Sequence, residues 1–595
     1  MAAPQDFTRI GAAGAPSFSR DGGTLFHLRG ADLPQIWAME LATGAARQLT
    51  FHDEKVAFLR RSPVDDRLIY GIDRGGDERQ QLLLLDPAAP CPEPQALTDD
   101  PAVIHDFGGW SPDGARIAFA ANARDEAHFD VFVRDVATGA RRCIHQGTHM
   151  MTVAGWRTDG ARLAAVADRG YGDMSLLILD PEAETAQPFP QPGPTNWQSV
   201  RWSGDGRTLL ALTDHGGSDH MRLCRLDPDS GEVTVVYAAP GRDVEAWAIS
   251  SDTTRLATIE NDRGWSILRL GAIDDERPAM IGPPHGIIAD ATFSPDGLLL
   301  AFTAAAPTEP PGLWIVQDGT ARPVFTPDPA EAGIDRASLI EPGLVAWESF
   351  DGKRIPGWLA LPQGKPPAGG HPAVIWVHGG PVGQARPNFR PDIQMLLSQG
   401  FAVLLPNVRG SLGYGRAWCE SDDRDKRLDS VADLAAAAKF LAALPQIDPG
   451  RIGIMGQSYG GFMVLSAITE YPQLWKAAVD YYGIADFRTL LAGTGPWRRN
   501  HRAAEYGDPE QDEALLDRIS PLGRVDRARA PLLVLHGTRD PRVPIGESEQ
   551  FVSALQERQL PVEYLVFGYA GHGFVRPADR QRAYAAVAAF FRKHL

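Results

Sequence analysis

The stretch Trp110-Ser-Pro-Asp-Gly-Ala-Arg-Ile-Ala-Phe119 contains the unit from which the first half of the chain is built. A polar turn at Asp113-Gly114 precedes residues that alternate between apolar and polar. Asp-Gly favours a tight turn between antiparallel strands because such a turn needs positive φ angles. The stretch therefore predicts a β-hairpin with one buried face.

Weaker copies of this unit recur along the chain at intervals of 44 to 48 residues. A second strand pair follows in each copy, as in the segment 130–144. Four strands in about 46 residues make one propeller blade. We interpret residues 10–325 as a seven-bladed β-propeller, in preference to a stack of β-sandwiches. The aspartates of the seven turns are Asp21, Asp65, Asp113, Asp159, Asp205, Asp252 and Asp296.

The pattern changes after a linker rich in Pro, Ala and acidic residues at 326–343. The segments 371–380 and 401–410 are continuous apolar runs that end in glycine-containing turns, which is typical of buried parallel strands. An alanine-rich helical segment, 430–445, follows them. Strands and helices alternate to the end of the chain, so this half is predicted to be an α/β domain with a parallel sheet.

Composition excludes several classes of protein. The 595 residues include 58 Lys and Arg against 75 Asp and Glu, and the net charge of −17 argues against nucleic acid as a partner. No apolar run of about 18 residues predicts a membrane span, and the N-terminus has no signal-peptide pattern. Four scattered cysteines fit a reducing compartment, so a cytoplasmic location is expected. The sequence leaves open whether the chain forms a homo-oligomer. The cysteines are Cys91, Cys143, Cys224 and Cys419.

The segment Gly456-Gln-Ser-Tyr-Gly460 fits the pattern G-x-S-x-G. A strand-like run precedes it and a helix-like run follows, so Ser458 is predicted to stand on a sharp strand-to-helix turn. A serine hydroxyl in this position is a candidate nucleophile, but it needs a base to act at neutral pH.

In this fold class the base follows the acid, and both follow the nucleophile. His572 comes after the strand-like run 562–567 on a loop flanked by glycines, which predicts that it is the base. The other histidines after Ser458 are less suitable, because they lie in an arginine-rich stretch, before the acid, or at the chain end. They are His501, His536 and His594.

Asp540 is the predicted acid, since it ends the strand segment 531–540 at the sheet edge where such sites gather. Asp480, at the end of the preceding strand, is its rival. The acid would hold the tautomer of His572 and stabilise the imidazolium.

A tetrahedral intermediate also needs two donors for its oxyanion. The backbone N–H of Tyr459 is one candidate. The turn His378-Gly-Gly-Pro381 is predicted to supply the other, unless it is merely a strand-ending turn.

Together these residues resemble the prolyl oligopeptidase family of serine peptidases, and most of all its acylaminoacyl-peptidase-like branch. The resemblance covers nearly the whole chain and implies a multidomain fold: a propeller domain at 1–330 for gating and substrate selection, followed by a C-terminal α/β-hydrolase catalytic domain at 331–595. The motifs are VHGGP from Val377, NVRGSLGYG from Asn407, GQSYGGF from Gly456, HGTRDPRVP from His536 and GHGF from Gly571.

The resemblance implies that Ser458, Asp540 and His572 form the triad and that the amides of Tyr459 and Gly380 are the oxyanion donors. It also implies that Arg542 binds a substrate backbone carbonyl, although a surface arginine holding its loop is the alternative. No metal or organic cofactor is implied.

Two departures from the family bear on specificity. Prolyl oligopeptidases carry Tyr-Gly-Gly-Phe where this chain has His378-Gly-Gly-Pro381, which counts against proline endopeptidase activity. Dipeptidyl peptidases bind the free amine with paired glutamates, and this chain has no Glu-Glu dipeptide.

The predicted function is hydrolysis of short peptides through an acyl-enzyme, by an acylaminoacyl-peptidase-like exopeptidase or oligopeptidase. The alternatives are a carboxypeptidase or dipeptidyl peptidase of the same family, an esterase or amidase, and a non-catalytic propeller scaffold. The cluster Arg498, Arg499 and Arg502 is either a solvated face or a clamp for a peptide C-terminal carboxylate.

Overall fold

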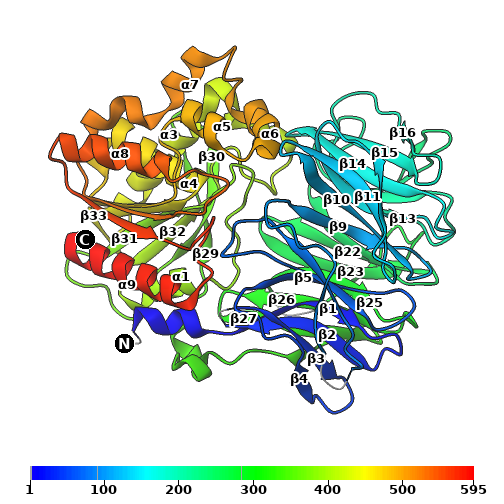
Figure 1. Cartoon of the computed structure of the whole chain (residues 1–595). Helices are drawn as coiled ribbons and strands as arrows, with labels where there is room; N and C mark the ends of the chain where they lie inside the picture. Colours follow the sequence, from blue (N-terminus) through cyan, green and yellow to red (C-terminus); the bar gives the residue numbers. More distant parts are fainter. Residues whose placement is uncertain (1–2, 32, 90–91, 283–284) are drawn as a thin grey trace.

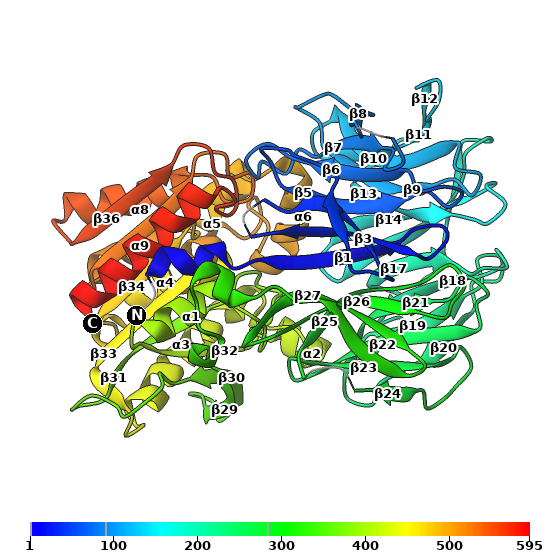
Figure 2. The same ribbon diagram turned by 90° about the horizontal axis from the view of Figure 1, so that it is seen from below.

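The computed structural model describes residues 3–31, 33–89, 92–282 and 285–595, and it places two domains side by side (Figures 1 and 2). Seven four-stranded antiparallel sheets form the first domain, and each sheet is built from four consecutive strands. The predicted seven-bladed β-propeller followed by an α/β-hydrolase domain is confirmed.

The propeller strands are, blade by blade, β1 Ala12–Phe18, β2 Thr24–Gly30, β3 Gln35–Glu40 and β4 Ala46–Gln48; β5 Val56–Arg61, β6 Leu68–Ile72, β7 Gln81–Leu85 and β8 Gln95–Ala96; β9 His105–Trp110, β10 Arg116–Asp125, β11 His128–Asp135 and β12 Arg141–His145; β13 Met150–Trp156, β14 Leu163–Gly170, β15 Asp173–Asp180 and β16 Thr185–Pro188; β17 Trp197–Trp202, β18 Leu209–Thr213, β19 Arg222–Leu226 and β20 Val233–Tyr237; β21 Asp243–Ile249, β22 Arg255–Asp262, β23 Trp265–Ala272 and β24 Ala279–Ile281; β25 Ile287–Phe293, β26 Leu300–Ala306, β27 Glu309–Gln317 and β28 Thr320–Phe325.

The repeated aspartate stabilises the turn at the start of each blade. In the third blade Ser111 Oγ donates to Asp113 Oδ1 over 2.5 Å, and the same carboxylate oxygen accepts from the backbone N–H of Ala115. Gly114 adopts φ +67°, as a turn of this kind requires. The aspartate therefore recurs at regular spacing in the sequence because each blade needs it to stabilise this turn.

One eight-stranded sheet forms the second domain, in the order β29-β30-β32-β31-β33-β34-β35-β36. All pairings among β31 to β36 are parallel. The strands β29 and β30 pair antiparallel with each other, and β30 pairs antiparallel with β32, so these two strands form one edge of the sheet. The strands are β29 Gly343–Glu348, β30 Arg354–Ala360, β31 His371–Val377, β32 Ala402–Pro406, β33 Ile447–Gln457, β34 Ala477–Tyr481, β35 Leu532–Gly537 and β36 Val562–Phe567.

Helices cover both faces of this sheet (Figure 2). Val431 of α3, Phe462 of α4 and Phe551 of α8 belong to the core on one face, and Ile393 of α1 and Phe591 of α9 to the core on the other. The helices are α1 Pro391–Ser398, α2 Arg416–Cys419, α3 Arg427–Ala442, α4 Tyr459–Glu470, α5 Phe487–Gly493, α6 Pro496–Tyr506, α7 Glu513–Ile519, α8 Gly546–Glu557 and α9 Pro577–His594, with short 3-10 helices η1 Pro4–Arg9, η2 Pro329–Ala332, η3 Arg336–Ser338, η4 Glu420–Asp422, η5 Arg424–Lys426, η6 Pro472–Leu474 and η7 Pro521–Arg527.

The N-terminal helix η1 packs on the hydrolase domain. Phe7 and Ile10 are buried in the same core as Phe591 of α9, although the sequence assigns residues 1–330 to the propeller domain. We propose that the chain passes from the propeller domain to the hydrolase domain near residue 330. We also propose that the N-terminal helix η1 belongs to the hydrolase domain.

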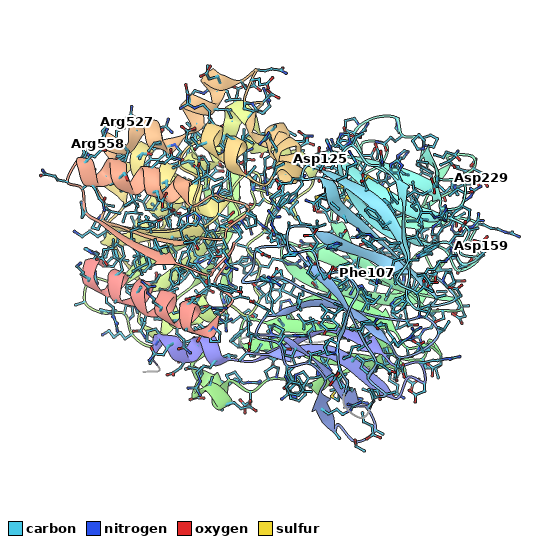
Figure 3. The ribbon with its side chains drawn as sticks, in the orientation of Figure 1. Phe107, Asp125, Asp159, Asp229, Arg527 and Arg558 are labelled. Atoms are coloured by element: carbon cyan, nitrogen blue, oxygen red, sulfur yellow. The ribbon has the colours of Figure 1, made fainter. Side chains whose placement is uncertain are left out.

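Exposed charges lie at both ends of the molecule. Figure 3 labels Asp159 and Asp229 on the propeller, far from the hydrolase domain, and Arg527 and Arg558 at the opposite end. Within residues 3–31, 33–89, 92–282 and 285–595, no helix combines the length and apolar character needed to cross a membrane. Cys143, Cys224 and Cys419 are free thiols, and Cys91 lies outside the described residues.

Candidate active site

Ser458 occupies the sharp turn between β33 and α4, with φ +58° and ψ −120°. This strained conformation is rare for a residue with a side chain. A Cβ atom on Gly456 would lie 2.3 Å from the carbonyl oxygen of Gly460, and one on Gly460 would lie 2.3 Å from that of Val377. Only glycines allow the strand and the helix to approach this closely around the serine.

His572 and Asp540 meet at the end of the sheet. His572 Nδ1 lies 2.7 Å from Asp540 Oδ2, and the other carboxylate oxygen accepts from the backbone N–H groups of Arg542 and Val543. Burial acts against the charge on Asp540, but His572 and the hydrogen bonds outweigh it and lower the pKa of Asp540. Burial lowers the pKa of His572 below 6.5, and Asp540 opposes that shift only in part. His572 is therefore held neutral with Nδ1–H toward the carboxylate.

Asp480, the rival acid, is directed elsewhere. It is 1% exposed, and its Oδ1 has no hydrogen-bond partner in the described part of the chain. Burial raises the pKa of Asp480 to about 7. His536 is also occupied, since its ring nitrogens lie 2.7 Å from Ser548 Oγ and 2.9 Å from the carbonyl oxygen of Val543.

The two predicted oxyanion donors flank Ser458. Tyr459 is the first residue of α4, where a backbone N–H has no partner within the helix. Its side chain points away into the core and is 2% exposed. Gly380 lies on the turn after β31, and a Cβ on the adjacent Gly379 would lie 3.4 Å from that of Ser458.

A cavity of about 400 Å³ joins these groups. Ser458, His572 and Gly380 line it, together with three arginines and a set of mostly apolar side chains. The remaining lining residues are Gly379, Val382, Gln457, Tyr459, Tyr482, Ile484, Leu490, Thr494, Arg498, Arg502, Tyr506, Arg542 and Val543.

The three predicted arginines of α6 have different surroundings. Arg498 and Arg502 line the cavity, so the interpretation of the cluster as a solvated face is wrong for these two. Arg499 is exposed and donates to the carbonyl oxygens of Leu491 and Ala492. Arg498 and Arg502 are four residues apart, so they lie on the same face of α6. Only the packing of α6 in the fold decides that this face is turned inward.

A propeller residue that the sequence did not single out also reaches the site. Glu78 lies on the loop between β6 and β7 and forms an ion pair with Arg542 Nε. Its other oxygen lies 3.9 Å from Arg498 Nη1. Arg542 is thus both a cavity residue and a holder of the domain interface. The only sequence signal for Glu78 is the polar, glycine-containing loop 73–80.

The same propeller loop contacts the loop of His572. The N–H of Gly571 donates to the carbonyl oxygen of Gly75 over 2.8 Å, and a Cβ on Gly571 would lie 1.9 Å from the carbonyl oxygen of Gly76. Glu54 accepts from the hydroxyl of Tyr569 and from the N–H of Gly75, each over 2.9 Å. The second blade therefore supports the base directly.

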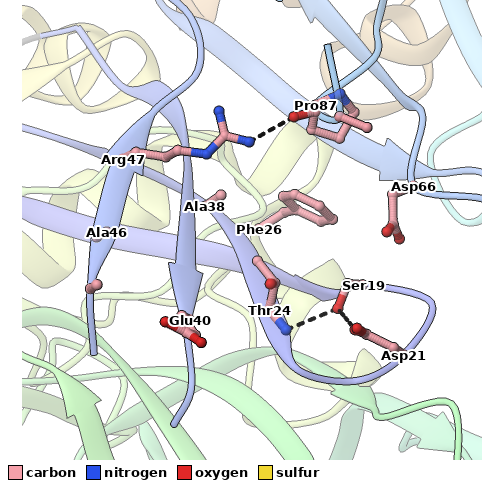
Figure 4. Close-up of a pocket in the computed structure, with 12 residues that line it drawn as sticks. Ser19, Asp21, Thr24, Phe26, Ala38, Glu40, Ala46, Arg47, Asp66 and Pro87 are labelled. Carbon is pink, nitrogen blue, oxygen red and sulfur yellow. Dashed lines mark hydrogen bonds between the residues drawn. The ribbon is translucent and has the colours of Figure 1, made fainter. Parts of the chain in front are cut away.

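Other cavities lie away from these groups. Figure 4 shows one of about 440 Å³ between the first two blades, where Arg47 Nη2 donates to the carbonyl oxygen of Pro87 and Ser19 Oγ to Asp21. Among the described residues, no group of three or more His, Cys, Asp or Glu side chains is arranged to hold a metal ion.

The fold and the site define a class: an α/β-hydrolase with a nucleophile elbow, a His–Asp pair at the sheet edge and a β-propeller over the site. Residues 387–595 match the model of the prolyl oligopeptidase family. The chain is 29% identical to dipeptidyl aminopeptidase BIII of Pseudoxanthomonas mexicana, over 88% of this chain and 77% of that protein. It is also 29% identical to an acylamino-acid-releasing enzyme of Arabidopsis thaliana, over 38% of this chain and 30% of that protein.

A crystal structure of puromycin hydrolase has the same fold. It superposes with a TM-score of 0.88 at 21% identity and covers 100% of this chain and 96% of that one. Residues 387–595 are a prolyl oligopeptidase family domain, and the protein is a serine peptidase.

Proposed function

We propose that this peptidase cleaves short peptides through an acyl-enzyme formed on Ser458. The observation that carries the proposal is the 2.7 Å contact between His572 Nδ1 and Asp540 Oδ2 beside the cavity that His572 and Ser458 share. Because Nδ1–H faces the carboxylate, Nε2 is left to accept the proton of Ser458.

The reaction then follows from the geometry. Ser458 Oγ attacks the scissile carbonyl carbon while its proton passes to His572 Nε2, and the N–H groups of Tyr459 and Gly380 bind the resulting oxyanion. The intermediate collapses as the imidazolium gives its proton to the leaving amine. Water attacks the acyl-enzyme with His572 as the base, which releases the acid and restores Ser458.

The charges of the cavity favour a peptide with a blocked N-terminus. Arg498, Arg502 and Arg542 line it, and no Asp or Glu is among the described lining residues. The nearby carboxylate of Glu78 is already paired with Arg542. Arg542 and Arg502 are paired with Glu78 and Glu505, and no carboxylate among the described residues lines the cavity to bind a free α-ammonium group, whereas an N-acyl group needs none. We propose an acylaminoacyl-peptidase-like exopeptidase in which Arg542, fixed by Glu78, donates to a substrate carbonyl.

A second candidate is removal of C-terminal residues. Burial and then the neighbouring cations Arg502 and Arg542 lower the pKa of Arg498 to about 10, so an anion beside it would be stabilised. A peptide C-terminal carboxylate is such an anion. The relative named as a dipeptidyl aminopeptidase represents the contrary expectation, release from a free N-terminus.

The test uses one short peptide in three forms: N-acetylated, free at both ends, and C-terminally amidated. Each is digested with the wild type, with Ser458→Ala and with the control Ser398→Ala on α1, and the fragments are read by mass spectrometry. Release of an N-acetyl amino acid by the wild type and the control alone is the expected result. C-terminal trimming that amidation blocks would favour the second candidate, and release from the free peptide alone would overturn both.

The position of the cavity restricts which substrates can reach Ser458. The cavity lies where a propeller loop meets the hydrolase domain, so a folded protein should be cut far more slowly than a peptide. Equal rates for a folded protein and for its unfolded form would contradict this. The cytoplasmic location and the absence of a nucleic-acid partner stay predictions from the sequence. The sequence makes no prediction of the oligomeric state.

A further inference from the structure

Arg502 makes a contact that neither sequence interpretation of the arginine cluster includes. Its Nη1 donates to the carbonyl oxygen of Gly380 over 3.1 Å and to Glu505 Oε2 over 2.7 Å. The Arg502 side chain is 16% exposed and that of Glu505 is 1% exposed. The cation is thus already paired with a buried anion and with the oxyanion turn.

Glu505 extends the contact toward the other oxyanion donor. Its backbone carbonyl oxygen accepts from Arg427 Nη2 over 2.9 Å, and Arg427 Nη1 donates to the hydroxyl of Tyr459 over 3.0 Å. Arg427 is fully buried and also pairs with Asp422. One continuous set of hydrogen bonds therefore joins the residues whose amides would bind the oxyanion.

We propose that Arg502 is a positioning residue for the oxyanion hole. Gly380 has φ +143° and no side chain, so no side-chain packing of its own holds its backbone in this conformation. The bond from Arg502 holds the carbonyl of the Gly380–Pro381 peptide unit and so restrains the backbone rotation of Gly380, whose own N–H belongs to the preceding peptide unit. Oxyanion donors act only if they are already in place when the charge develops. The inference rests on the oxyanion role proposed for Gly380.

This role differs from that of a carboxylate clamp in what it affects. A clamp binds a peptide end in the ground state, so its loss raises KM for substrates that carry a C-terminal carboxylate. A positioning residue acts on the transition state, so its loss lowers kcat for every substrate, including neutral esters.

The experiment compares Arg502→Met and Arg502→Lys with the control Arg499→Met on the exposed side of the same helix. Substrates are a neutral acyl ester, an N-acetyl peptide amide, and the same peptide with a free carboxylate. For Arg502→Met we expect kcat to fall about 10²-fold on all three, with KM nearly unchanged, as after loss of one oxyanion donor. Arg502→Lys should recover part of the loss, and Arg499→Met should match the wild type.

Loss of Arg502 leaves Glu505 buried without its cation, which can prevent folding. The double variant Arg502→Met with Glu505→Gln removes both charges and keeps the test available. A second measurement uses a peptide aldehyde, which forms a tetrahedral adduct with the serine. Its inhibition constant should rise in parallel with the loss of kcat, while binding of the cleavage product stays constant.

The outcomes separate the two proposals. Unchanged kcat in the Arg502 variants, or a rise of KM confined to the carboxylate substrate, would overturn the positioning role while hydrolysis that depends on Ser458 continued. If the wild type cleaved none of the substrates, or cleaved them equally well as Ser458→Ala, the proposed function itself would fail.

Discussion

Asp480 and Asp540 belong to neighbouring strands of one sheet, yet their surroundings are opposite. Asp480 lies within β34, so its side chain projects into the packed layer between Gly461 and Gly483, whose missing side chains leave it room. Asp540 lies three residues beyond the end of β35, where the chain has left the sheet and backbone N–H groups converge on its carboxylate. Burial is severe for both and raises the pKa of Asp480, whereas at Asp540 the charge of His572 and the side-chain hydrogen bonds of His536 and His572 outweigh burial and lower the pKa.

The contrast shows that position at a sheet edge is too coarse a guide to a catalytic acid. A carboxylate can orient a histidine only if it is charged at working pH and reaches past the strand end. Asp540 meets both conditions, because its pKa is lowered and His572 Nδ1 lies 2.7 Å away. The pKa of Asp480, raised to about 7, makes it a neutral packing group below neutral pH.

The largest expected effect is on activity. Asp540→Asn should lower kcat by about 10⁴, because an amide no longer enforces the Nδ1–H tautomer or stabilises the imidazolium. Asp480→Asn, the matched control, should keep kcat near the wild-type value. Steady-state kinetics on one Ser458-dependent substrate measures both, and similar losses in the two variants would erase the distinction.

The next effect is on stability. A carboxyl whose pKa is raised from 3.8 to about 7 in the folded state stabilises the fold below the unfolded pKa, and that stability is lost as pH rises toward 7. The cost of ionising Asp480 is on the order of 4 kcal/mol above pH 7. Asp480→Asn should therefore gain stability relative to the wild type between pH 5 and pH 8. Thermal unfolding of both proteins in matched buffers tests this, and a difference independent of pH would contradict it.

The smallest effect is a shift of the pH profile. His572 must be neutral to accept the proton of Ser458, and its pKa lies below 6.5 because burial outweighs the opposing charge of Asp540. The acid-side midpoint of kcat/KM should accordingly fall below pH 6.5. It should stay there in Asp480→Asn. A midpoint at or above 6.5 in the wild type would mean that Asp540 dominates the electrostatics of His572.

Much of this arrangement follows from the sequence, because its signals are local. The turn aspartates mark the blades through contacts within a few residues, as at Asp113. The sharp turn at Ser458 can be predicted from the sequence, because the glycines beside it are required by the close approach of the local backbone. The order of the chain also narrows the base and the acid to a few candidates.

What the sequence could not supply depends on how distant segments pack. Arg502 reads as one of several surface cations until the docking of α6 turns it toward Gly380. Glu78 reads as a loop residue among many, because more than 450 residues separate it from Arg542. No spacing rule connects such pairs, and their chemistry exists only at the junction of the two domains.

The contact between Gly571 and the loop of the second blade has a consequence for how this architecture can change. With no room for a side chain on Gly571, the propeller loop and the base loop fit each other atom by atom. A propeller transplanted from another member of the family would have to bring a loop of matching length and shape, or the base would lose its support. We therefore expect the two domains to be inherited as a pair, and substitutions at Gly75, Gly76 and Gly571 to be tolerated only in combination.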